Sequence, residues 1–140
     1  MTGITFIIRG EPIRVTQQQH RFGGHKANGK AIVYRDDRLA SAYDWLCMEM
    51  RRQMAEAKNV NFRKIDEGCT VYISWYFGTS TKRLQGRYKI TRPDVDNLAK
   101  GILDALVRAG VIADDGLVAR LELEKHWSSK AEARTIIAVY

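Results

Sequence analysis

Hydrophobic residues are concentrated in four segments whose pattern is typical of β-strands. Thr2–Arg9 is rich in β-branched and aromatic residues and predicts an N-terminal strand. Alternating apolar and polar positions predict three further strands at Cys69–Phe77, Val118–Trp127 and Arg134–Tyr140. The aromatic and β-branched composition of Cys69–Phe77 indicates that this strand lies in the centre of a sheet.

Two other segments space their hydrophobic residues three and four positions apart, which is the period of an α-helix. The first lies between Asp36 and Lys58 and predicts a long amphipathic helix, whose apolar stripe is formed by Leu39, Ala42, Tyr43, Leu46, Met50 and Met54. This stripe is expected to face the core, although a methionine-rich face also suits a dimer interface.

A second helix is predicted over Val95–Arg108, where the apolar positions are Val95, Leu98, Ile102, Leu103 and Leu106. Proline disfavours helical geometry in the residue before it, so this helix cannot extend back past Pro93, and Gly110 provides a C-terminal stop. The face opposite the leucines is polar and carries Asp96, Asn97, Lys100 and Asp104.

The predicted order is strand, long loop, helix, strand, loop, helix and two strands. This order indicates an α+β fold with a mixed β-sheet packed with helices. With 140 residues, of which 45% are hydrophobic, the chain is long enough for one core. We therefore expect a single domain spanning residues 1–140.

The balance of charges favours a nucleic-acid partner. Lysine and arginine outnumber aspartate and glutamate by 23 to 16, which gives a net charge of +7. Cys47 and Cys69 lack the spacing of a metal or redox motif and are expected to be buried free thiols in a reducing compartment. The apolar run Ile4–Ile8 is too short for a signal peptide or a membrane span, so a cytoplasmic protein is expected.

Two polar loops concentrate the positive charge. The stretch Gly10–Lys30, part of a predicted 10–33 loop, interleaves glycine, glutamine and Phe22 with Arg14, Arg21, Lys26 and Lys30. This composition suits DNA backbone contacts with base stacking, or simply a flexible loop. The second loop, Gly78–Thr91, leads directly into the second helix and supplies Lys82, Arg83, Arg87 and Lys89, followed by Arg92. It is interpreted as a phosphate track, with an ordinary solvated loop as the alternative.

Acidic residues flank the second predicted helix on both sides. Asp94 and Asp96 stand at its start, and Asp114 and Asp115 follow its end. If the chain returns the second pair to the first, the converging carboxylates need a cation, and hard oxygen ligands select Mg²⁺ or Mn²⁺. The sequence therefore predicts a magnesium site with open positions for water and a substrate phosphate.

Each of these acidic residues also has an ordinary structural explanation. Aspartate near a helix N-terminus is favoured by capping and by the helix dipole, which applies to Asp94 and Asp96. Lys100 lies four residues after Asp96 and can form a surface ion pair with it. The sequence Asp114-Asp115-Gly116 is also typical of a turn. The combination of all these residues around one short helix favours the metal site.

The same stretch resembles the RusA family of Holliday-junction resolvases. The resemblance rests on RPDVDNLAK from Arg92 to Lys100, then DAL, then AG with a hydrophobic residue, then DD with a valine three residues on. It extends to about Lys125. RusA proteins are small, dimeric, magnesium-dependent endonucleases common in phages and prophages. The resemblance thus implies a RusA-like homodimer that nicks two symmetry-related strands of a four-way DNA junction.

The resemblance also implies roles for individual residues. The catalytic, metal-binding aspartates of the family match Asp94, Asp96 and Asp115, and its essential lysine matches Lys100. Lys125 falls where family members often carry lysine, on an otherwise apolar strand face. It is expected to turn towards the carboxylates or a DNA phosphate, although a strand end emerging into solvent is an alternative.

The sequence therefore predicts a metal-dependent endodeoxyribonuclease acting on four-way junctions in DNA recombination and repair, with Mg²⁺ as cofactor and Mn²⁺ as an alternative. No small-molecule cofactor and no membrane partner are expected. A homodimer is expected because two symmetric nicks need two sites related by the two-fold axis of the junction. Two alternatives are a junction- or duplex-binding protein without catalysis and a less selective branched-DNA nuclease. Asp104 and Asp114 are secondary candidates for the site.

Overall fold

The computed structural model describes residues 3–14, 21–25, 31–34 and 37–140. Within these ranges the strands are β1 (Ile4–Arg9), β2 (Arg21–His25), β3 (Ala31–Tyr34), β4 (Cys69–Gly78), β5 (Val118–Ser128) and β6 (Arg134–Val139). The helices are α1 (Asp37–Met54) and α2 (Val95–Arg108), together with short 3₁₀ turns, of which η3 is Asp115–Leu117 and η4 is Lys130–Glu132. These bounds confirm the predicted α+β class and the predicted order of the main strands and helices.

The main sheet has four strands in the order β1-β6-β4-β5. β4 pairs in parallel with β5 and antiparallel with β6, while β1 pairs antiparallel with β6. The sheet is therefore mixed, and β4 lies inside it as predicted. Because β4 and β5 are parallel, the chain between them must cross from one end of the sheet to the other, and α2 makes that crossing.

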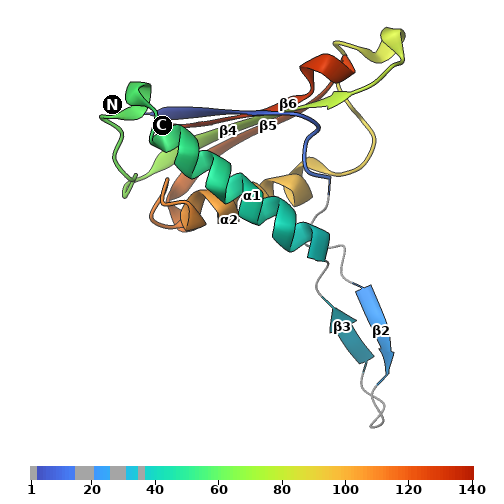
Figure 1. The fold of residues 1–140 in the computed structure, drawn as a ribbon, viewed down its shortest axis with the longest axis horizontal. Helices are drawn as coiled ribbons and strands as arrows, with labels where there is room; N and C mark the ends of the chain where they lie inside the picture. Colours follow the sequence, from blue (N-terminus) through green and yellow to red (C-terminus); the bar gives the residue numbers. More distant parts are fainter. Residues whose placement is uncertain (1–2, 15–20, 26–30, 35–36) are drawn as a thin grey trace.

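The core lies between one face of the sheet and the two helices. Figure 1 shows α1 and α2 on the same side of the four strands. Inward-facing strand residues pack there against the apolar stripes of both helices, and the fully buried large side chains include Phe6, Met50, Ile73, Trp75, Phe77, Leu98, Leu106 and Ile137. Met50 in this set confirms that the methionine stripe of α1 contributes to the core. In the part of the chain that the structure describes, neither α1 nor α2 covers the other face of the sheet (Figure 1).

Gly101 allows the two helices to approach closely. It is buried in the middle of α2, and a Cβ atom at this position would lie 2.1 Å from Cζ of Tyr43 on α1. The Tyr43 ring is itself 6% exposed. Burial, and then the negative charge of Asp104, raises the pKa of Tyr43 to about 12, so its hydroxyl stays protonated near neutral pH. The close contact between α1 and α2 thus depends on the absence of a side chain at Gly101.

Gly101→Ala is expected to destabilise the protein by about 1–3 kcal/mol, because the added methyl group overlaps a buried ring that has little room to move. This loss exceeds the gain of about 1 kcal/mol in helix propensity that alanine otherwise brings. Urea unfolding followed by circular dichroism measures the difference. Gly68→Ala is the matched control, since nothing lies within 4 Å of a Cβ atom there. Equal stability of the two variants would refute this account of the helix contact.

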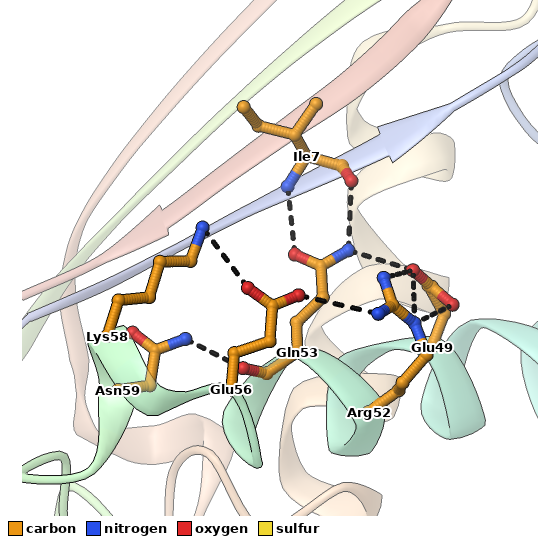
Figure 2. Close-up of polar contacts among 7 residues, drawn as sticks. All are labelled: Ile7, Glu49, Arg52, Gln53, Glu56, Lys58 and Asn59. Atoms are coloured by element: carbon orange, nitrogen blue, oxygen red, sulfur yellow. Dashed lines mark hydrogen bonds and ion pairs between the residues drawn. The ribbon is translucent and has the colours of Figure 1, made fainter.

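The free edge of β1 is closed by a side chain of α1. Ile7 N–H donates to Oε1 of Gln53 at 3.2 Å, and Nε2 of Gln53 donates to the Ile7 carbonyl at 2.9 Å (Figure 2). Gln53 is 5% exposed and also donates to Glu49 at 3.0 Å. An unpaired edge strand can recruit another strand, and here the amide occupies the place of that strand at Ile7.

The predicted 10–33 loop is the main error in the secondary structure. Part of it forms a two-stranded antiparallel sheet, in which β2 pairs with β3 across an irregularity between Phe22 and Gly24. This hairpin lies apart from the main sheet (Figure 1). The run Ala31–Tyr34 has the β-branched and aromatic composition of a strand. It is only four residues long and follows a stretch rich in glycine and glutamine, so the sequence pattern indicates a loop.

In the described part of the chain, no helix is both long enough and apolar enough to cross a membrane. Both Cys47 and Cys69 are buried free thiols, as predicted.

Candidate active site

The first acidic pair lies at the N-terminus of α2. Asp94 occupies the N-cap position, where its backbone carbonyl accepts from Leu98 N–H at 3.1 Å. Within α2, all of whose residues are described, the Asp94 carboxylate accepts no capping hydrogen bond. Asp96 follows in the first turn, and both side chains are exposed. The carboxylates are therefore available for another role, and the capping explanation does not account for Asp94.

A buried lysine holds the backbone that leads into this pair. Lys89 is 3% exposed, and its ammonium donates to the carbonyl and hydroxyl of Thr91 at 3.1 and 2.5 Å and to the carbonyl of Arg92 at 2.5 Å. Its Nζ also lies over the rings of Phe77 and Trp127, at 5.2 and 4.8 Å from their centroids. Carbonyl oxygens and aromatic faces thus replace the water that a buried ammonium loses. This burial does not fit the prediction that Lys89 contacts DNA.

A second lysine holds the same segment from β5. Lys125 Nζ donates to the carbonyls of Thr91 and Pro93, at 2.7 Å in each case. Burial lowers the pKa of Lys125, and the charge of the Asp94 carboxylate opposes that shift. Burial, and then the charge of Lys125, lowers the pKa of Lys89 to about 8. Two positively charged groups therefore support the start of α2, and the Lys125 ammonium binds backbone carbonyls beside Asp94.

The second acidic pair lies around η3. Asp114 precedes this turn, and its carboxylate accepts from Gly116 N–H at 3.0 Å. Asp114 therefore stabilises the turn, which is the ordinary structural explanation for an Asp-Asp-Gly sequence. Asp115 begins the turn and its side chain is exposed. Of the two, Asp115 is the residue whose carboxylate stays available for a ligand.

The two pairs lie at opposite ends of the crossover. Residues 111–113, which lead to the second pair, lie beside Ile65, whose N–H donates to the Val111 carbonyl at 2.9 Å. This contact is close to the end of the sheet where β4 and β5 both begin. Asp94 instead lies near Lys125, and the seven residue-to-residue steps along β5 from Val118 to Lys125 span about 23 Å. α2 covers a similar length, about 21 Å for 14 residues. Figure 1 shows α2 extending between the two ends.

The prediction that the crossing brings Asp115 to Asp94 and Asp96 within one protomer is therefore wrong. A connection between parallel strands must start at the end of one strand and finish at the beginning of the next, so its two ends are separated by the length of the sheet. Consistently, no three or more His, Cys, Asp or Glu side chains among the described residues are grouped so that they could hold a metal ion. The donor types suit Mg²⁺, but one protomer does not assemble them.

Comparison with known proteins identifies the family. Residues 12–140 match the model of the family described as endodeoxyribonuclease RusA. A relative from Lactococcus phage r1t, described as a crossover junction endodeoxyribonuclease rusA, is 29% identical over 112 residues, which cover 79% of this chain and 78% of the relative. The chain belongs to the RusA family of endodeoxyribonucleases. The resemblance seen in the sequence is thereby confirmed.

The basic residues of this RusA protein lie in different environments. Lys82, Arg83, Arg87 and Arg92 are exposed along the segment that precedes α2. Arg14 places its guanidinium 4.7 Å from the Phe77 ring centroid and pairs with Glu11 at 3.1 Å. The side chain of Arg21 is not described, and Lys26 and Lys30 lie outside the described residues.

The segment before α2 is more ordered than a solvated loop. Its residues 86–89 pair with the edge of β5 through bonds from Gly86 N–H to the Trp127 carbonyl, from Trp127 N–H to the Arg87 carbonyl and from Lys89 N–H to the Lys125 carbonyl, each 2.9 Å long. The backbone that carries Arg87 is therefore held against the edge of β5.

On α2 itself, Lys100 is exposed one helical turn after Asp96, as the helical spacing predicts. Next to Asp96, Oδ1 of Asn97 is buried and has no hydrogen-bond partner among the described residues. From the sequence, Asn97 is one residue of the polar face of α2. The supporting role of Lys89 could not be predicted, because a lysine in a polar loop carries no sequence signal for burial.

Proposed function

We propose that this RusA-family endodeoxyribonuclease is a homodimeric, divalent metal-dependent enzyme that resolves four-way DNA junctions by paired symmetric nicks. The observation that carries the proposal is the separation of Asp115 from the exposed pair Asp94 and Asp96 by the length of α2. A site that needs all three carboxylates requires a second copy of the chain. A two-fold dimer then provides two such sites, which matches the two-fold symmetry of a junction.

In the proposed assembly, Asp94 and Asp96 of one protomer face Asp115 of the partner subunit. A bound Mg²⁺, or Mn²⁺ in its place, would neutralise these carboxylates and supply positive charge to the phosphoryl oxygens of the scissile phosphate. Lys89 and Lys125 keep the start of α2 in position. Lys100 adds positive charge where negative charge grows in the transition state. The exposed Lys82, Arg83, Arg87 and Arg92 bind backbone phosphates beside the site, with Arg14 as a further candidate.

The family and the relative's name support the choice of substrate. The phage protein is described as acting on crossover junctions, and the match covers most of both chains. The net charge of +7 supports binding to a polyanion. We also propose a cytoplasmic location, since the DNA substrate and the two free thiols fit a reducing compartment.

One gel experiment tests the proposal. Labelled four-way junction, flap and plain duplex are incubated with the protein in Mg²⁺, in Mn²⁺ and in EDTA. We expect metal-dependent nicks at symmetric positions in two opposing strands of the junction, and at least about tenfold slower nicking of the duplex. Equal nicking of all three substrates would indicate a less selective nuclease. Tight junction binding without nicking in either metal would indicate a binding protein.

A further inference from the structure

Three rings and a guanidinium form a continuous stack on the sheet. Tyr76 and His126 are stacked, with centroids 4.9 Å apart and planes at 12°. On the far side of Tyr76, the Arg134 guanidinium carbon lies 3.9 Å from the ring centroid. Beyond His126, the Tyr88 ring follows at 5.2 Å and 35°. The order along the stack is therefore Arg134, Tyr76, His126 and Tyr88.

This stack lies on the face of the sheet that the helices leave open. Tyr76 pairs in register with His126 on β5 and with Arg134 on β6, so the three side chains share one face. The sequence neighbours of Tyr76, Trp75 and Phe77, are buried in the core on the other face. Strand residues alternate between faces, which places the stack opposite α1 and α2 (Figure 1).

Polar contacts restrain His126 and the backbone on either side of Tyr88. Glu124 Oε2 lies 3.1 Å from Nε2 of His126 and also accepts from the Tyr72 hydroxyl at 2.9 Å. The backbone on either side of Tyr88 is bonded to β5 through Arg87 and Lys89. Little conformational entropy therefore remains to be lost when another flat group packs on Tyr88.

Tyr88 is the end of the stack that faces solvent. Its side chain is 67% exposed, although aromatic residues normally bury most of their surface. Nearby Ile90 is 91% exposed and adds a second apolar group on the same segment. Arg87 and Arg92 are exposed on either side of these two residues. An apolar ring between cations matches a nucleotide, which has an apolar base and an anionic phosphate.

We propose that Tyr88, backed by His126, Tyr76 and Arg134, is a stacking site for a DNA base that is unstacked at the branch point of a junction. The inference rests on the proposed function and specifies how the substrate is recognised. Duplex DNA keeps its bases stacked internally, whereas a branch point exposes base faces that an aromatic ring can cover. The site therefore favours branched over plain DNA without reading its sequence.

Binding measured in EDTA tests the proposal without cleavage. A four-way junction carries 2-aminopurine at the branch point, and its fluorescence and affinity are compared for wild type, Tyr88→Ala and Tyr88→Phe. Base stacking contributes about 1–3 kcal/mol, so Tyr88→Ala should weaken junction binding by about 5- to 150-fold and abolish quenching of the probe. Tyr88→Phe should keep both properties, and the affinity for plain duplex should change less than about twofold in either variant.

Three outcomes would overturn the proposal. Equal losses of affinity for junction and duplex would make Tyr88 a general DNA contact. Unchanged junction affinity in Tyr88→Ala would leave the ring without a role in binding. A shift of Tyr88→Ala from dimer to monomer in equilibrium sedimentation would make the exposed ring a subunit contact. Failure of the proposed function itself would appear separately, as absence of metal-dependent nicking by the wild-type protein.

Discussion

Asp96→Asn is expected to reduce the rate of junction nicking by about a hundredfold or more while leaving junction binding equal or tighter. The substitution removes one of the negative charges proposed to hold the metal. It also removes repulsion between a carboxylate and the DNA phosphates, which is why affinity should not fall. Single-turnover nicking in Mg²⁺ and electrophoretic mobility shifts in EDTA measure the two effects separately.

Glu56→Gln is the control for Asp96→Asn, because it removes one half-exposed carboxylate that follows the end of α1 and pairs with Arg52 and Lys58, and it is expected to nick normally. Asp96 is exposed on the first turn of α2, so its replacement should not unfold the protein. Urea midpoints for both variants check this point. Nicking by Asp96→Asn at the wild-type rate would show that the role assigned to this carboxylate is wrong.

Mixed dimers of Asp96→Asn and Asp115→Asn protomers are expected to recover nicking that neither homodimer shows. If each site takes Asp96 from one protomer and Asp115 from its partner, the mixed dimer has one site with both substitutions and one intact site. Co-expression with two affinity tags yields this species. It should nick one strand of each junction at about half the wild-type rate per dimer, without the paired second nick.

Both homodimers are the controls, and each should be inactive because both of its sites carry one substitution. Equilibrium sedimentation at micromolar concentration should show dimers for wild type and for both variants. An inactive mixed dimer would show that the two aspartates act within the same protomer. Monomers at micromolar concentration would argue against paired nicking by a preformed dimer.

Local pattern was sufficient for most of the secondary structure. α2 begins and ends where its leucine spacing, Pro93 and Gly110 predict, and β4, β5 and β6 differ from their predicted bounds by no more than a residue. Each of these elements buries one face, so its hydrophobic residues recur with the period of a helix or a strand. The hairpin of β2 and β3 was missed because its strands are short and lie among glycines.

The site residues stay a prediction, but their expected arrangement within one protomer was wrong. All three of Asp94, Asp96 and Asp115 are exposed. Their separation depends on the direction of β5 relative to β4, which no local pattern specifies. Lys89 shows the same limitation, because its burial depends on Phe77 and Trp127, which are distant in sequence.

The sequence by itself determined the α+β class, the two helices and the acidic and basic residues around α2, because each follows from local spacing and charge. Only the tertiary structure decided that the parallel pairing of β4 and β5 places the two acidic pairs at opposite ends of α2. It also decided that Lys89 is buried against Phe77 and Trp127, and that Tyr88 is the exposed end of the stack formed with His126 and Tyr76. These features arise from contacts between strands far apart in sequence, where the energies of packing and of hydrogen bonding exceed local preference.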